Sequence, residues 1–130
     1  MRLLAIFIFL LLFCCQTKEQ TNIKLINGQW EITEVKMSDG YKKKYTINEF
    51  IDFYDINKGI KMKLKADLMG NFTSTQVADS VFYKNDLLHV ITPFDTMVYE
   101  IETLTDQQLI LVDKDENNYI YKKYKKLNLN

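Results

Sequence analysis

The chain has 130 residues, which is the size of one domain, and 47% of them are hydrophobic, which is enough for a core. Its 17 basic residues balance its 17 acidic residues, so no net charge favours nucleic acid. Arg2 is the only arginine, which also argues against recognition of phosphate or guanine by paired guanidinium hydrogen bonds.

The N-terminus predicts an export signal. Arg2 precedes the apolar run 3–13, which is too short for a bilayer because a spanning helix needs about 20 apolar residues. Two cysteines and a polar stretch follow. The pattern resembles the lipoprotein signal of bacteria, with Leu12 at the favoured leucine position and Cys15 as the acylated residue. The resemblance implies a signal peptide with a lipobox at 1–15 and a lipid anchor in a membrane of the cell envelope, at the outer membrane or the periplasmic face. A plain secretory signal cut near Cys15 is the alternative.

The remainder begins with a polar stretch. It divides into a tether at 16–24, a domain at 25–126 and a C-terminal tail at 127–130. Gly28-Gln29-Trp30 opens the first predicted strand, and the break in alternation at Glu34-Val35 predicts a bulge. The run Lys42–Lys44 predicts a solvated loop, with contact to phosphate or lipid headgroups as the alternative.

Ile60–Leu68 is the most regular stretch of the chain, because apolar and charged residues alternate along it without a break. Only a backbone of period two separates them cleanly, so we predict a strand of an antiparallel sheet with one dry face and one wet face. A second strand is expected at Phe50–Ile56, joined to it by a turn at 57–59. The residues expected in the core are Ile60, Met62, Leu64 and Leu68, and those expected in solvent are Lys61, Lys63 and Lys65.

Further short strands follow, each joined to the next by a few residues. They are predicted at Phe72–Val77, Ser80–Lys84, Leu87–Thr92, Thr96–Leu104, Gln107–Val112 and Tyr119–Lys126. Such a meander must protect its edges, and closure into a barrel does so. We therefore expect an all-β fold, a small antiparallel up-and-down β-barrel of about eight strands.

The chain resembles the lipocalin-like domains (calycins) of small bacterial lipoproteins. Gly28-Gln29-Trp30 matches the Gly-x-Trp at the start of the first lipocalin strand, and the segments that look like the last three strands are Tyr99–Ile101, Leu104–Leu111 and Tyr119–Lys123. The resemblance implies a barrel plugged at its closed end by Trp30, with a mouth that admits a small apolar ligand. The last strand lacks the arginine that stacks on this tryptophan in lipocalins, so Lys122 or Lys123 is expected over the indole.

The resemblance thus predicts a membrane-anchored protein that binds a small apolar ligand at the cell envelope. Its cavity would be lined by Trp30, Met62, Leu64 and Tyr99. The alternative is a module with a solid core, filled by its own aromatic side chains, that docks on another envelope protein through its tyrosine- and lysine-bearing surface.

Candidate catalytic and metal-ligating residues are few. His89 is the only histidine, and a surface or hydrogen-bonded role suits it better than catalysis. The acidic run 113–116 lacks the spacing and the glycine of a calcium loop, so it is read as a hairpin turn. Asp52 and Asp55 fall on opposite faces of the predicted strand, which argues against a paired acid and base. The sequence therefore predicts neither an enzyme nor a metal or cofactor site.

Overall fold

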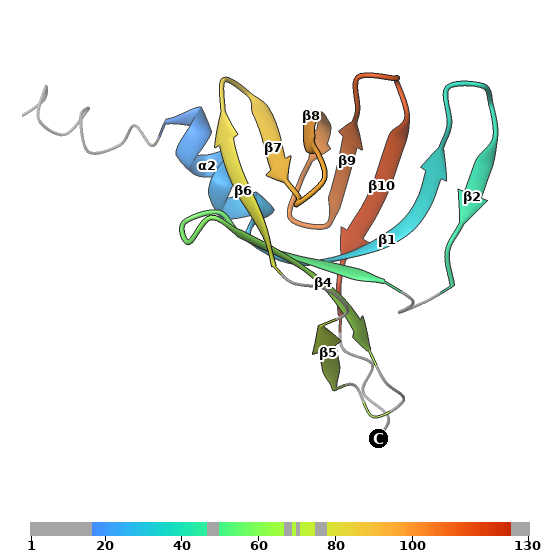
Figure 1. The fold of residues 1–130 in the computed structure, drawn as a ribbon, viewed down its shortest axis with the longest axis horizontal. Coiled ribbons are helices and arrows are strands. Elements are labelled where there is room, and N and C mark those ends of the chain that lie inside the picture. The colour runs from blue at the N-terminus through green and yellow to red at the C-terminus, as the bar shows by residue number, and fades with distance from the viewer. Residues whose placement is uncertain (1–16, 47–49, 67–68, 70, 75–77, 126–130) are drawn as a thin grey trace, which may run out of the picture.

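The structure, a computed structural model, describes residues 17–46, 50–66, 69, 71–74 and 78–125. Its elements are helix α2 (Lys18–Ile26) and the strands β1 (Gly28–Lys36), β2 (Lys42–Lys44), β3 (Ile51–Asp55), β4 (Ile60–Ala66), β5 (Phe72–Ser74), β6 (Asp79–Lys84), β7 (Leu87–Ile91), β8 (Thr96–Leu104), β9 (Gln108–Val112) and β10 (Asn118–Lys123) (Figure 1). The predicted signal peptide, the candidate acylation site Cys15, the core residue Leu68 and the tail at 127–130 lie outside the described residues.

Eight of the strands close into an antiparallel barrel in the order β1-β3-β4-β6-β7-β8-β9-β10, with β10 pairing back onto β1. Strand β2 extends the sheet beside the upper half of β1, and β5 pairs with the part of β4 that runs beyond the barrel (Figure 1). The predicted all-β barrel is confirmed. The register of β1 against β10 shifts between Ile32 and Glu34, which confirms an irregularity at the predicted bulge.

The tight turns follow from local chemistry. Asn85 and Asp86 join β6 to β7 and both have positive φ, 54° and 62°, as a two-residue type I′ hairpin turn requires. Gly59 closes the turn between β3 and β4 with φ of 70°, which glycine adopts without steric cost. Both hairpins were predicted from the sequence.

Helix α2 corrects the predicted tether at 16–24. Thr17 caps the helix in a capping box, in which its side chain accepts a hydrogen bond from the backbone N–H of Gln20 and the Gln20 side chain accepts one from Thr17. Ile26 is fully buried and Ile23 packs beside it against the barrel core. The helix therefore covers one end of the barrel, beside β6 and the end of β8 (Figure 1).

Trp30 lies at this closed end, as predicted. Its ring is fully buried, and its Nε1 donates a hydrogen bond to the carbonyl of Ile26 at 2.7 Å. The Lys123 ammonium lies 4.6 Å from the centroid of the indole and donates to the Asn27 carbonyl at 3.2 Å, which confirms the predicted cation above the ring. Gly28 leaves room for it, because a Cβ at that position would lie 2.6 Å from the Lys123 Nζ.

The orientation of β4 differs from the prediction. Its register against β3 places Lys61 opposite Tyr54 and Lys63 opposite Asp52, and Asp52 is in turn opposite Trp30. The lysine side of β4 therefore shares the inner face of the barrel with the buried tryptophan. Lys61 is half-buried there, whereas Lys63 is exposed.

The apolar side of β4 faces away from the barrel interior. Leu64 is opposite Ile51, and both are buried as expected of the dry face, while Ile60 and Met62 are only half-buried. Strand β5 continues the sheet beside β4, and its Phe72 ring meets Tyr124 edge to face at 5.3 Å. The alternation correctly predicted a strand and a dry face. The expected inward direction of that face was wrong, because the register that sets Asp52 opposite Trp30 puts the lysine side of β4 on the inner face.

Candidate functional site

The candidate site is the polar cluster on the inner face of β3, β4 and β10. Asp52 is a buried residue, 7% exposed, and its carboxylate lies 3.8 Å from the ammonium of Lys61. The Tyr121 hydroxyl from β10 is hydrogen-bonded to Asp52, and the Lys61 ammonium lies 5.8 Å from the centroid of the Tyr54 ring. An ion pair and two phenols thus meet inside a barrel whose remaining core is largely apolar.

Burial sets the electrostatics of the phenols. Loss of solvent, and then the negative charge of Asp52, raise the pKa of Tyr54 well above its ordinary value. The same causes raise the pKa of Tyr121. Both hydroxyls therefore stay neutral at physiological pH, so each can donate a hydrogen bond.

A second group of rings leads from this cluster toward the end of the barrel opposite α2, which we call the distal end. Tyr99 meets Tyr119 edge to face at 5.6 Å, and the Tyr119 hydroxyl donates to Asp113 at 2.9 Å. Burial, and then the charges of Asp113 and Asp52, raise the pKa of Tyr99 to about 12. The charges of both carboxylates therefore act on the pKa of Tyr99.

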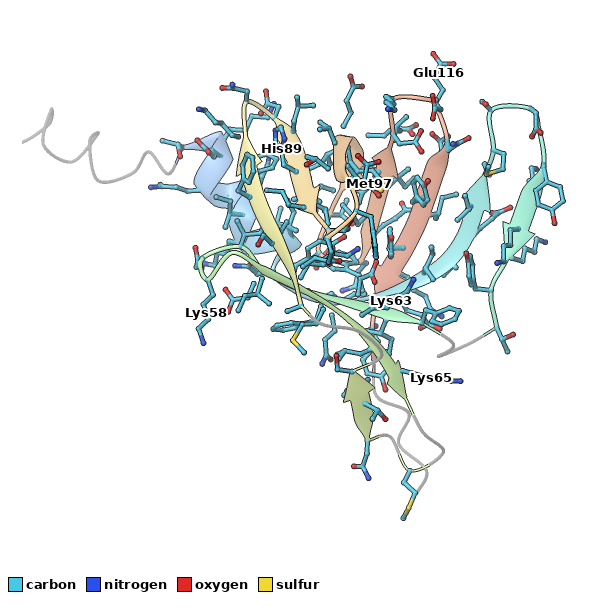
Figure 2. All side chains as sticks on the ribbon, in the orientation of Figure 1. Lys58, Lys63, Lys65, His89, Met97 and Glu116 are labelled. Carbon is cyan, nitrogen blue, oxygen red and sulfur yellow. The ribbon has the colours of Figure 1, made fainter. Side chains whose placement is uncertain are left out.

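The distal end itself is built by the connection between β7 and β8 and by the turn between β9 and β10. A pocket of about 240 Å³ lies between them, lined by Asp95, Thr96, Met97, Val98 and residues 113–115. Met97 is half-buried and packs against the core, and its sulfur accepts a hydrogen bond from the Tyr99 hydroxyl at 3.7 Å (Figure 2). The distal end is thus lined by polar side chains around an aromatic interior.

The structure brings together only two of the four residues predicted to line a cavity. Trp30 is buried at the closed end and Tyr99 packs against the same core cluster. Met62 and Leu64 lie on the opposite face of the sheet, because they pair with Phe53 and Ile51. The four therefore do not face one common space.

The other residues considered as candidates in the sequence make contacts that stabilise the fold. His89 stacks on Phe82 with ring centroids 4.4 Å apart, on the outer face of the sheet. Although partial burial acts in the opposite direction, hydrogen bonds from Asn117, Tyr119 and the Asp115 backbone lower the pKa of Asp113. The acidic run is therefore a hairpin turn held by its own carboxylate. Within the described ranges, no cluster of three or more metal-ligating side chains occurs.

Asp52 and Lys61 were not predicted as a site. Asp52 is one of two acids in an aromatic strand, and its apolar neighbours Ile51 and Phe53 were an available indication of a buried carboxylate. The run Lys42–Lys44, read as a loop, is the short exposed strand β2. In the part of the chain that the structure describes, no helix is long and apolar enough to cross a membrane.

No family model and no curated protein matches the sequence. Two solved structures share the fold. A lipocalin-like protein from Bacteroides uniformis ATCC 8492 superposes with a TM-score of 0.61 at 16% identity, over 76% of this chain and 98% of that one. An uncharacterized protein from Bacteroides eggerthii DSM 20697 gives a TM-score of 0.60 at 15% identity, over 76% and 99%. With its closed antiparallel barrel of eight strands and its buried Gly-x-Trp, the chain has the fold of a lipocalin-like domain.

Proposed function

We propose that this protein is a lipid-anchored binding protein of the bacterial cell envelope, whose barrel holds a small molecule between the Asp52–Lys61 pair and the distal end. The observation that carries the proposal is the buried ion pair itself. We expect the barrel to bind its ligand without transforming it, and within the described residues no cluster of three or more metal-ligating side chains accompanies the pair.

A buried ion pair contributes little to the stability of a fold. Removing two charges from water costs several kcal/mol per ion, and their mutual attraction seldom repays this. The Asp52 and Lys61 side chains are 9% and 18% exposed, so both are largely desolvated. Because the pair does not repay this cost in stability, its retention supports a role in recognising a polar group on the ligand.

The rings of Tyr99 and Tyr119 support an apolar or aromatic body for the same ligand, because aromatic side chains offer apolar area with a polar edge. The sequence predicted a purely apolar ligand. The inner lysine side of β4 favours instead an amphipathic molecule, whose head reaches Asp52 and Lys61 while its body contacts the tyrosine rings.

Titration with a fluorescent probe that has an aromatic body and a charged head, such as an anilinonaphthalene sulfonate, tests the proposal. We expect saturable binding that Tyr121→Phe weakens, because this change removes the hydroxyl hydrogen-bonded to Asp52. The matched control is Tyr83→Phe, an equally buried tyrosine whose hydroxyl contacts Asn22 beside α2. Equal weakening by both variants, or no saturable binding to the folded wild type, would refute the proposed site.

The anchor is tested separately by Cys15→Ser. Two or more acyl chains give stable membrane attachment at about 0.8 kcal/mol for each buried CH₂, so their loss should release the protein into the soluble fraction. A variant that stays in the membrane pellet after carbonate washing would contradict the anchor and leave the barrel site untouched.

A further inference from the structure

A groove of about 650 Å³ lies on the outer face of the barrel, where β7, β8 and β9 run side by side. Its floor is apolar and its sides are acidic. The floor is made by Leu87, Val98 and Val112, and the acidic groups are Glu100, Glu102 and Glu116. The register explains the floor, because Leu87 and Val112 are the cross-strand neighbours of Glu100 on either side.

The acidic groups of the groove are exposed and uncompensated. Among the described residues, neither Glu100 nor Glu102 forms an ion pair within 4.0 Å, and the one basic side chain in the lining is Lys114. Glu116 projects outward from the turn between β9 and β10, where its φ is 64° (Figure 2). The groove therefore offers negative charge that no partner within the described structure neutralises.

The wall of the groove is held in place before any partner binds. The Asp113 carboxylate accepts hydrogen bonds from the backbone of Asp115 at 2.9 Å and of Asn117 at 3.0 Å, and from the Tyr119 hydroxyl. These bonds fix the turn that carries Lys114 and Glu116. A wall that is already ordered reduces the entropy cost of binding.

The apolar floor continues beyond the groove across the neighbouring strands. The register places Phe82, His89 and Val98 in one row, and the first two rings are stacked with an angle of 7° between their planes. Phe82 is 42% exposed and Val98 37% exposed, and Ile91 in the next row is 41% exposed. Exposed apolar area of this extent on a sheet face, rimmed by charge, is typical of a protein–protein contact.

We propose that this groove docks a basic segment of another protein, in which lysine or arginine side chains alternate with apolar ones. The basic side chains would form charge-assisted hydrogen bonds with Glu100 and Glu102, and the apolar ones would cover Val98 and the Phe82–His89 pair. Glu100 faces away from the barrel interior, because it alternates with Tyr99, which packs against the core, and the groove shares only Val98, Asp113 and Lys114 with the lining of the distal pocket.

Fluorescence anisotropy tests the proposal with the full-length protein in phosphatidylcholine nanodiscs. The probe is a short dye-labelled peptide of alternating arginine and valine, and empty nanodiscs provide the blank. We expect saturable binding that weakens with rising salt, and about a tenfold loss in Glu100→Gln/Glu102→Gln, because two exposed ion pairs at about 0.7 kcal/mol each together amount to about one factor of ten. Val98→Ser should also weaken binding.

The matched control is Glu19→Gln/Asp106→Asn, which removes the same charge from exposed positions outside the groove and should bind the peptide as wild type does. A peptide of alternating glutamate and valine should not bind. Equal binding by the two double variants, binding of the acidic peptide, or no saturable binding would overturn the proposal. Self-association of the wild type that Glu100→Gln/Glu102→Gln abolishes would overturn it in favour of a second copy as the occupant.

Discussion

The two ion pairs of the described structure have the same length and different surroundings, so they provide a test of the interior site. Lys61 lies 3.8 Å from Asp52 inside the barrel, and Lys122 lies 3.8 Å from Glu31 on the outer face. Both carboxylates are largely buried, with the Asp52 and Glu31 side chains 9% and 5% exposed, but the Lys61 side chain is 18% exposed and that of Lys122 is 54% exposed. Replacing each lysine by methionine keeps the length of the side chain and removes the charge.

We expect Lys61→Met to cost about 3 kcal/mol of unfolding free energy, because it leaves Asp52 as a buried charge without its cation. This figure is at the lower end for a buried pair, since 3.8 Å is a long separation and the Tyr121 hydroxyl still donates to the carboxylate. Lys122→Met should cost less, no more than about 1 kcal/mol, because water already screens the 54% exposed ammonium, although the Glu31 carboxylate that it leaves is itself buried.

Urea unfolding followed by the fluorescence of Trp30, the single tryptophan, measures both effects. With an m-value of about 1.5 kcal/mol per molar urea, the midpoint should fall by about 2 M in Lys61→Met and by less than about 0.7 M in Lys122→Met. The double variant Asp52→Leu/Lys61→Met should recover wild-type stability or exceed it, yet bind no charged probe. Equal costs for the two single variants, or a double variant as unstable as Lys61→Met, would refute the assignment of the pair to ligand recognition.

Three further outcomes are expected. Gly28→Ala should lower the melting temperature, because φ is 122° there and the new Cβ would displace the Lys123 ammonium from above the indole. Thr17→Ala should cost about 1 kcal/mol in urea unfolding, since it removes the N-cap of α2. The unfolded phenol of Tyr99 ionises near pH 10 and the folded one at about 12, so its contribution to stability is complete below pH 10 and is lost as pH rises toward 12. The difference in tyrosinate absorbance between wild type and Tyr99→Phe should therefore change together with circular dichroism in an alkaline titration, and a Tyr99 transition separate from unfolding would contradict this.

The sequence predicted the strands well because hydrophobic periodicity and turn chemistry are local. Thr96–Leu104 has the predicted bounds, and Asn85-Asp86 is the short turn between the strands predicted at Ser80–Lys84 and Leu87–Thr92. Trp30 was placed correctly from a short motif, and of the two lysines expected over the indole it is Lys123 that lies there. Each of these properties depends on residues close in the chain or on one pairwise contact.

The errors concern tertiary arrangement. Alternation along Ile60–Leu68 separates two faces but does not say which is inside, and here the register against β3 puts the lysine face with Asp52 and Trp30. The inward direction of Lys61 depends on Asp52, which pairs with it only through the register of β3 against β4. Helix α2 was missed, although Thr17-x-x-Gln20 ahead of apolar Ile23 matches a capping box.

Strand β2 has a consequence for the behaviour of many copies held close together. In the described structure it pairs only with β1, so its other edge presents unpaired backbone groups that a second chain could extend. All three residues of this edge are exposed lysines. A second copy that approached with the same edge would place one lysine triplet against another, and this repulsion disfavours growth of a continuous sheet between copies. The lysines thus protect against aggregation where anchoring would raise the local concentration.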